Sequence, residues 1–302
     1  MSHESLERAK AVQDDEYMTY YKDVEEELKH YDFSGKTVFC PCDNRKSSFY
    51  KYFRDNFDRL GLKELIISIK DIPRCAVWQH YNKNDGLWIH VYKEGDGDFR
   101  HWETRKLLER CDVIVTNPPF SLFREFFRWC AGSGKEYLIL GPLAAVGYRI
   151  VFDEIKAGNC SCGINKNRRL KFYRTDSQED RITEGGLECV WLTNMKNDGI
   201  GKKKLADLNL MNMLEQILYN KALSRALNRK YGAIDYPVYD NYPAIEVPVL
   251  SGIPLDYEGV MGVPITILKY YEPDKIELVK VTDPHLQGKN VFKRIFIRWK
   301  KH

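Results

Sequence analysis

The chain has 302 residues, which is long enough to bury the core of one large domain or of two medium domains. Its 47 Lys and Arg residues barely exceed its 43 Asp and Glu residues, so the composition alone does not identify a nucleic-acid partner. The sequence contains no apolar run as long as a membrane helix and begins with polar residues rather than a signal peptide, so we expect a soluble, intracellular protein without a membrane segment.

Charge is unevenly distributed along the chain. The segment from Lys196 to the C-terminus holds 17 basic and 12 acidic residues, whereas the preceding part holds 30 and 31. This asymmetry predicts a polyanion-binding region joined to a nearly neutral domain. We therefore expect two domains, 1–195 and 196–302.

The first expected elements are a helix and a buried strand. Lys22 to Tyr31 is a charged stretch with apolar residues four apart, which predicts a short amphipathic helix that Thr19 could cap. Thr37 to Cys40 predicts a buried strand, and the Pro-Cys-Asp-Asn turn that follows it leads into a helix from Ser47 to Phe57. In this turn, Asp43 is either the N-terminal acid of the helix or a ligand-binding carboxylate.

The next strand is expected from Leu62 to Ile69, with Asp71 just beyond its end. In dinucleotide-binding folds, an acid at this place bonds ribose hydroxyls. A hairpin is expected from Trp78 to Tyr92, and an acidic loop that ends in Gly97, Asp98 and Phe99 precedes another helix. Asp98 is either a solvated turn residue or a ligand acceptor.

The segment from Asp112 to Phe120 reads as a buried strand that two prolines terminate, because proline cannot donate a ladder hydrogen bond. The chain must therefore turn at Asn117. The side-chain oxygen of Asn117 and the carbonyl of Pro118 can each accept one N–H of an exocyclic amine, while Phe120 stacks on the attached ring. The alternative is an ordinary strand end whose Pro118-Pro119 pair makes only a turn.

An aromatic helix from Leu122 to Cys130 and strands at 137–142 and 187–194 complete the first expected domain. Between them lies a basic stretch without acids, which predicts phosphate contacts if it is more than a solvated face. Its candidates are Lys166, Arg168, Arg169 and Lys171, and the candidates of the linker after Gly199 are Lys202, Lys203 and Lys204. Beyond the linker, proline-rich segments precede strands expected at 265–268, 276–281 and 291–299.

The eight cysteines include two closely spaced pairs, Cys40 with Cys42 and Cys160 with Cys162. A four-thiolate zinc site is conceivable, but structural zinc sites usually space each pair more widely. We therefore interpret these residues as buried, reduced cysteines and expect no metal site.

Several of these features together resemble a known family. Asn117-Pro118-Pro119-Phe120 resembles motif IV of the S-adenosylmethionine-dependent amino-methyltransferases. The order of Tyr-x-Thr, Cys-Pro-Cys-Asp-Asn, Gly-Asp-Phe and Asn-Pro-Pro-Phe, with the C-terminal strings 239–247 and 259–266, resembles the EcoRI-type adenine-specific DNA methyltransferases. The glycine-poor turn at Pro41 departs from the usual pattern.

The resemblance implies an α/β fold in which a Rossmann-like S-adenosylmethionine-dependent methyltransferase sheet is joined to a C-terminal mixed α/β target-recognition region. It implies methylation of adenine N6 in a short duplex site, with base flipping, in a restriction-modification setting. The expected partner is double-stranded DNA, and we expect a monomer in the cytoplasm of a prokaryotic or phage-infected cell. The implied catalytic residues are Asn117, Pro118, Pro119 and Phe120, and the implied cofactor-binding residues are Tyr17, Thr19, Cys40, Pro41, Asp43, Asn44, Asp71, Asp98, Phe99 and Asn117.

Two other functions remain open from the sequence. The same Asn-Pro-Pro-Phe geometry could serve a methyltransferase that acts on RNA or on another amino group. The weak turn after Cys40 would also suit a non-catalytic DNA-binding protein on a methyltransferase scaffold, although an intact Asn117 to Phe120 argues against it. The recognised DNA sequence does not follow from these residues.

Overall fold

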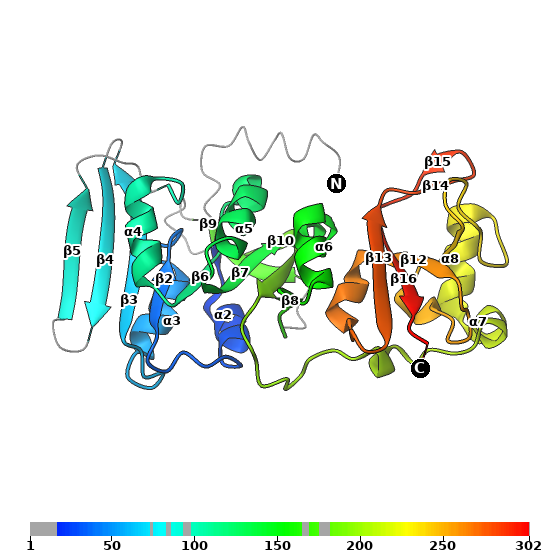
Figure 1. Ribbon diagram of the computed structural model, residues 1–302, viewed down its shortest axis with the longest axis horizontal. Coiled ribbons are helices and arrows are strands. Elements are labelled where there is room, and N and C mark those ends of the chain that lie inside the picture. Colours follow the sequence, from blue (N-terminus) through cyan, green and yellow to red (C-terminus); the bar gives the residue numbers. More distant parts are fainter. Residues whose placement is uncertain are drawn as a thin grey trace. The chain divides into compact units, whose positions relative to one another are not determined.

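The computed structural model describes residues 17–72, 75–82, 86–92, 98–164, 169–174 and 182–301. Its contacts divide the chain into two compact units (Figure 1). The first runs to Leu143 and resumes over Ser161–Gly201, and the second combines Ala144–Cys160 with the chain from Lys202 onward. The boundary expected between residues 195 and 196 lies six residues before the last of these transitions.

The first unit is built on a mixed sheet with strand order β1-β9-β10-β7-β6-β2-β3-β4-β5. Strands β7, β6, β2 and β3 are parallel, and antiparallel β10 and β4 flank them. The strands of this unit are β1 (Tyr17–Thr19), β2 (Thr37–Cys40), β3 (Glu64–Ile72), β4 (Cys75–Asn82), β5 (Gly86–Tyr92), β6 (Val113–Thr116), β7 (Glu136–Pro142), β8 (Ser161–Cys162), β9 (Arg169–Arg174) and β10 (Ile182–Thr193).

Helices cover both faces of the parallel strands, with α2 and α3 on one side and α4 and α5 on the other (Figure 1). All four residues of β2 and of β6 are buried, as expected for strands covered on both faces. Val38 and Cys40 of β2 pack in the cluster that α2 and α3 share. The helical segments are α2 (Tyr21–Leu28), α3 (Ser48–Asp55), α4 (Trp102–Arg110), η1 (Phe120–Leu122) and α5 (Phe123–Ala131).

The order of the parallel strands places a switch in winding direction at β2. The chain passes from β2 through α3 to β3 on one side, whereas β6 pairs with the other side of β2 and continues through α5 to β7. In open α/β sheets, ligands bind outside the carboxyl ends of the strands at such a switch point. The turns after Cys40 and after Thr116 both lie there.

The second unit holds a four-stranded sheet of order β11-β12-β16-β13 and the short hairpin β14-β15. Its strands are β11 (Ala244–Glu246), β12 (Val260–Pro264), β13 (Ile276–Thr282), β14 (His285–Leu286), β15 (Lys289–Asn290) and β16 (Arg294–Trp299). Its helical segments are η2 (Leu143–Gly147, which begins at the last residue of the first unit), α6 (Arg149–Lys156), η3 (Leu205–Leu208), α7 (Met213–Tyr219), α8 (Lys221–Tyr231), η4 (Leu250–Gly252) and η5 (Ile265–Tyr270). The predicted α/β class is confirmed.

Three local predictions were wrong. The strand expected at 265–268 is the short helix η5, because Pro264 ends β12 one residue earlier. Strand β3 continues to Ile72, because β4 pairs with it beyond the parallel region, so Asp71 lies within the strand rather than past its end. Thr19 does not cap α2: the N-cap residue is Tyr20, and no side chain bonds the first turn.

The cysteines at 40, 160 and 162 are buried, as predicted, and Cys42 is half-buried. Burial raises the pKa of the Cys111 thiol to about 12 and also raises the pKa values of Cys40 and Cys130, so these thiols stay protonated at neutral pH. Across the described ranges, no three potential ligands from His, Cys, Asp and Glu gather as a metal ion would need. Within the same ranges, no helix combines the length and apolar character needed to cross a membrane.

Candidate active site

The centre of the candidate site is a hydrogen bond between the turns that follow β2 and β6. The hydroxyl of Thr116 donates to Oδ2 of Asp43 across 2.6 Å, although the two residues are 73 positions apart. Asp43 is 5 % exposed and Thr116 is fully buried. A carboxylate is therefore held at the switch point of the sheet, and its hydrogen-bonding partner is the residue directly before Asn117.

The amide of Asn117 is held by a residue near the N-terminus. Its Nδ2 donates to Oγ1 of Thr19 across 3.4 Å, a long hydrogen bond between residues 98 positions apart. The carbonyl of Thr19 in turn accepts a 2.5 Å hydrogen bond from Oγ of Ser48, the first residue of α3. Three segments that are far apart in the sequence thus meet at one end of the sheet.

The rest of the Asn-Pro-Pro-Phe turn continues away from the strand end. Pro118 is buried, whereas Pro119 and Phe120 are half-buried. Phe120 begins the short helix η1 and packs against the cluster shared by α2, α3 and the central strands. The turn therefore places one partly exposed aromatic ring three residues after Asn117.

The turn after β2 compensates for its lack of glycines with side-chain hydrogen bonds. Cys40 and Pro41 are buried, and Oδ1 of the half-buried Asn44 accepts from the Lys46 N–H at 2.8 Å. The Ser47 hydroxyl caps α3 by accepting from the Tyr50 N–H at 3.0 Å. Asn44 thus shapes the turn, and Asp43 is the buried acid within it.

Asp98 and Phe99 have local partners in the structure. The carboxylate of Asp98 forms a bidentate ion pair with Arg100, at 2.8 Å from Nε and 2.6 Å from Nη2, and these bonds raise the pKa of Arg100. The Phe99 ring is buried and packs edge-on against Phe126 of α5 at 5.0 Å between centroids. Both residues order the loop before α4, so a cofactor contact by Asp98 would share its carboxylate with Arg100.

Several predicted residues lie partly or wholly outside the described part of the chain. The structure gives the backbone of Tyr17 in β1, of Asp71 in β3, and of Arg169 and Lys171 in β9, but not their side chains. Lys166 and Arg168 lie outside the described residues. In the second unit, Lys202 and Lys204 are exposed, and the ammonium of Lys203 lies 5.1 Å from the ring centroid of Tyr270.

Two residues of the site were not predicted from the sequence. Thr116 was read only as the last residue of a buried strand, and Ser48 only as part of a helix. A hydroxyl directly before the Asn-Pro-Pro turn was the available signal for Thr116. No local signal marks Ser48, because its partner Thr19 becomes a neighbour only when α3 packs beside β1.

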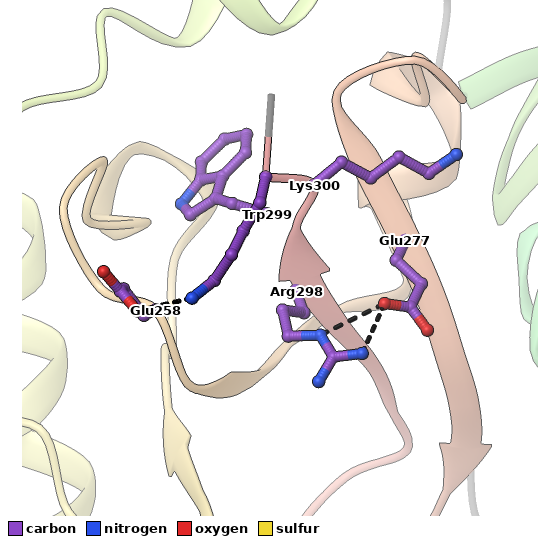
Figure 2. Close-up of a pocket in the computed structure, with 6 residues that line it drawn as sticks. Glu258, Glu277, Arg298, Trp299 and Lys300 are labelled. Carbon is purple, nitrogen blue, oxygen red and sulfur yellow. Dashed lines mark hydrogen bonds and ion pairs between the residues drawn. The ribbon is translucent and has the colours of Figure 1, made fainter.

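A depression of about 490 Å³ in the C-terminal unit is lined by the end of β16, by the two lysines that follow it, and by Glu258 and Glu277. Figure 2 shows Arg298 pointing at Glu277, and their closest contact is 2.7 Å. Lys301 lies 3.0 Å from Glu258. Both carboxylates of this depression are thus held in exposed ion pairs with Arg298 and Lys301, so we do not regard it as a catalytic site.

Comparison with known proteins identifies the family to which the chain belongs. The family described as "Adenine-specific methyltransferase EcoRI" matches residues 5–301. The chain belongs to this family. It is 36% identical to the Type II methyltransferase M.EcoRI of Escherichia coli over 336 aligned residues, which cover 98% of this chain and 96% of that protein. It is 32% identical to M.MpnI of Mycoplasma pneumoniae, over 90% of this chain and 84% of that protein.

A further relative, M.MgeORF184P of Mycoplasma genitalium, is 32% identical over 90% of this chain. Membership of the family confirms the predicted enzyme class, an adenine-specific methyltransferase. Membership of this methyltransferase family implies that S-adenosylmethionine is the methyl donor. The residues at the switch point fit that molecule chemically, because a buried carboxylate and neighbouring hydroxyls suit its cationic amino acid portion better than a phosphate cradle would.

Proposed function

We propose that this chain methylates N6 of an adenine within one short sequence of duplex DNA, with S-adenosylmethionine as donor and a Rossmann-like arrangement of the first unit. The observation that carries the proposal is the meeting of Asn117, Thr19 and Asp43 at the switch point of the sheet. An amide for the substrate amine and a carboxylate for the cofactor are placed on adjacent strands, as transfer between the two requires.

Asn117 and Pro118 would bind the amino group of the target base. The Asn117 side-chain oxygen and the Pro118 carbonyl each accept one N6–H, which holds the nitrogen and draws its lone pair out of conjugation with the ring. Phe120 stacks on the base. Because N6 is out of reach inside a duplex, the adenine must leave the stack at a cost of a few kcal/mol.

The proposed cofactor contacts come from the turn after β2. S-adenosylmethionine supplies an activated methyl group on a positively charged sulfur when it is bound. Asp43 would bind the positively charged amino group, with its carboxylate oriented by Thr116. Thr19 would orient both the Asn117 amide and the start of α3, so that the substrate amine and the cofactor are held in one geometry.

We expect Asp43→Asn to weaken S-adenosylmethionine binding by about 10- to 100-fold, because hydrogen bonds to a charged group contribute about 1.5–3 kcal/mol. The substitution keeps the shape of the side chain and a partner for Thr116. Calorimetric titration of purified protein measures the change. Asp55→Asn is the matched control, because Asp55 is an exposed residue of α3 that forms an exposed ion pair with Arg54. Equal affinities for the two variants would place the cofactor elsewhere.

DNA binding is proposed to use the C-terminal part of the chain, residues 196–302, together with the basic segment that contains Lys166, Arg168, Arg169 and Lys171. We expect the double variant Lys202→Gln, Lys204→Gln to reduce the slope of log affinity against log salt by about 2, since each lost phosphate contact removes about 0.9. Fluorescence anisotropy of a labelled duplex over a salt series measures it. Lys275→Gln is the control, because Lys275 is paired with Glu272 at 2.6 Å. An unchanged slope would leave Lys202 and Lys204 as solvated residues.

The function itself is tested by transfer of labelled methyl from S-adenosylmethionine to duplex DNA, to RNA and to a sample without nucleic acid. Label in the duplex, recovered as N6-methyladenine after hydrolysis, is the expected result. Label in RNA alone would show that the substrate is RNA and not DNA. Binding of DNA without any label would show a non-catalytic scaffold.

A further inference from the structure

The hairpin β14-β15 of the C-terminal unit has the chemistry of an element that reads base pairs. Two strands of two residues each pair antiparallel, with His285 opposite Asn290 and Leu286 opposite Lys289. The connecting residues Gln287 and Gly288 have φ values of 52° and 72°. Positive φ at both positions is typical of a type I′ turn, the tightest connection between two strands.

A hairpin this short would not be stable alone, and the structure shows what holds it. The carboxylate of Asp240 accepts from the N–H groups of Gln287 at 3.1 Å and Gly288 at 2.8 Å. The Asp240 N–H donates to the carbonyl of His285 at 2.9 Å, and the side chain of Gln287 donates to the carbonyl of Tyr231 at the end of α8. Leu286 is buried among the aromatic residues of the second core. The backbone of the hairpin is therefore fixed to the unit.

The fixed hairpin presents side chains that the fold itself does not use. Lys289 and Asn290 are exposed, and Phe292, two residues beyond the hairpin, is 79% exposed. Within the described part of the chain, the side chains of Lys289 and Asn290 make no hydrogen bond or ion pair. Figure 1 shows the hairpin beyond the end of β13, at one extremity of the C-terminal unit. A rigid support that displays unused polar and aromatic groups indicates a binding element.

The kinds of side chain displayed indicate the ligand. Asn binds the N6 and N7 edge of adenine with two hydrogen bonds, Lys binds O6 and N7 of guanine, and an aromatic ring contacts the thymine methyl group. The major groove is about 12 Å wide and admits a two-stranded β-ribbon. The ammonium of Lys293, next to Phe292, lies 3.7 Å from the carboxylate of Asp283 and is therefore not counted among these groups. Such a set of donors and one apolar ring suits base edges better than it suits a protein surface.

We infer that the hairpin 285–290 enters the major groove of the DNA substrate, where Asn290 and Lys289 contact base edges and Phe292 makes an apolar contact with the bases. This inference rests on the proposed function and adds to it the residues that determine sequence specificity. Gln287 and Asp240 are positioning residues, since their hydrogen bonds are used to hold the hairpin.

The test uses the full-length protein and an unmethylated plasmid as probe. Wild-type protein, Lys289→Ala, Asn290→Ala and Phe292→Ala are each incubated with S-adenosylmethionine, and the methylated adenines are mapped by single-molecule sequencing. We expect the preference for the wild-type site over sites that differ by one base pair to fall about 10-fold or more in Lys289→Ala and in Asn290→Ala, and methylation of the wild-type site to fall about 10-fold in Phe292→Ala. The matched controls are Lys221→Ala, Asn228→Ala and Tyr219→Ala, exposed residues of α7 and α8 that should change neither quantity.

The outcomes distinguish failure of the proposed function from failure of the hairpin assignment. Absence of methylated adenine with wild-type protein would overturn the proposed function. Wild-type protein that methylates one site, with hairpin variants that keep the same site and preference as the controls, would overturn the hairpin assignment alone. Thermal melting decides the role of Phe292: an unchanged Tm supports a DNA contact, and a fall of several degrees would show that the ring is covered by the protein itself.

Discussion

Asn117→Ala should lower the rate of methyl transfer to duplex DNA by at least about 10²- to 10³-fold, the usual loss when one positioned polar group is removed from a reacting centre. The amide acts on the substrate nitrogen and not on the core, and the hydrogen bond that it donates to Thr19 is long, at 3.4 Å. The affinity for S-adenosylmethionine should therefore change only a few-fold. Single-turnover transfer of labelled methyl and calorimetric titration measure the two quantities.

A matched control for this experiment is Asn56→Ala. Asn56 is the C-cap residue of α3, and its amide donates to the carbonyl of Tyr52 at 2.9 Å. Thr19→Val tests the support of Asn117, since it removes the acceptor of the amide; the rate should fall, but less than in Asn117→Ala. Transfer by Asn117→Ala within a few-fold of wild type would remove Asn117 from the catalytic role. Loss of cofactor binding together with transfer would make it a cofactor ligand instead.

Arg294→Met should destabilise the C-terminal unit by about 3–5 kcal/mol, the usual consequence of leaving one partner of a buried ion pair uncompensated. The side chain of Glu246 is fully buried and that of Arg294 is 6% exposed. Arg294 Nη2 donates to Glu246 Oε1 at 2.7 Å, and the hydroxyls of Tyr231 and Tyr239 also donate to this carboxylate. Without Arg294, the carboxylate would remain in the core without its cation.

Urea unfolding combined with amide hydrogen exchange of β11, β12 and β16 measures this loss where it occurs. Arg298→Met is the matched control on the same strand, because Arg298 pairs with Glu277 at the surface, and exposed pairs contribute about 0–1 kcal/mol. The double variant Glu246→Leu, Arg294→Met should recover much of the stability, since it removes both charges. Equal losses for Arg294→Met and Arg298→Met would show that the burial of the pair has no energetic importance.

Much of the first unit followed from the sequence alone. The apolar run before Asn117 predicted β6, and the two prolines predicted its end, because both signals act within a few residues. The same reasoning located the strand that ends at Cys40, the hairpin after β3 and the aromatic helix after Phe120. The family resemblance, carried by short motifs in a fixed order, was confirmed by comparison with known proteins.

Tertiary structure decided which of these parts meet. The bond from Thr116 to Asp43 joins residues 73 positions apart and depends on β6 pairing with β2. Asp98 is paired with Arg100, a contact that the sequence did not indicate. Glu246 meets Arg294 across 48 positions through the order of strands β11, β12 and β16. Local propensity and proline chemistry depend on neighbours along the chain, and these determined the elements. The pairing of charges and hydroxyls depends on strand order and burial, which arise only when the whole sheet has formed.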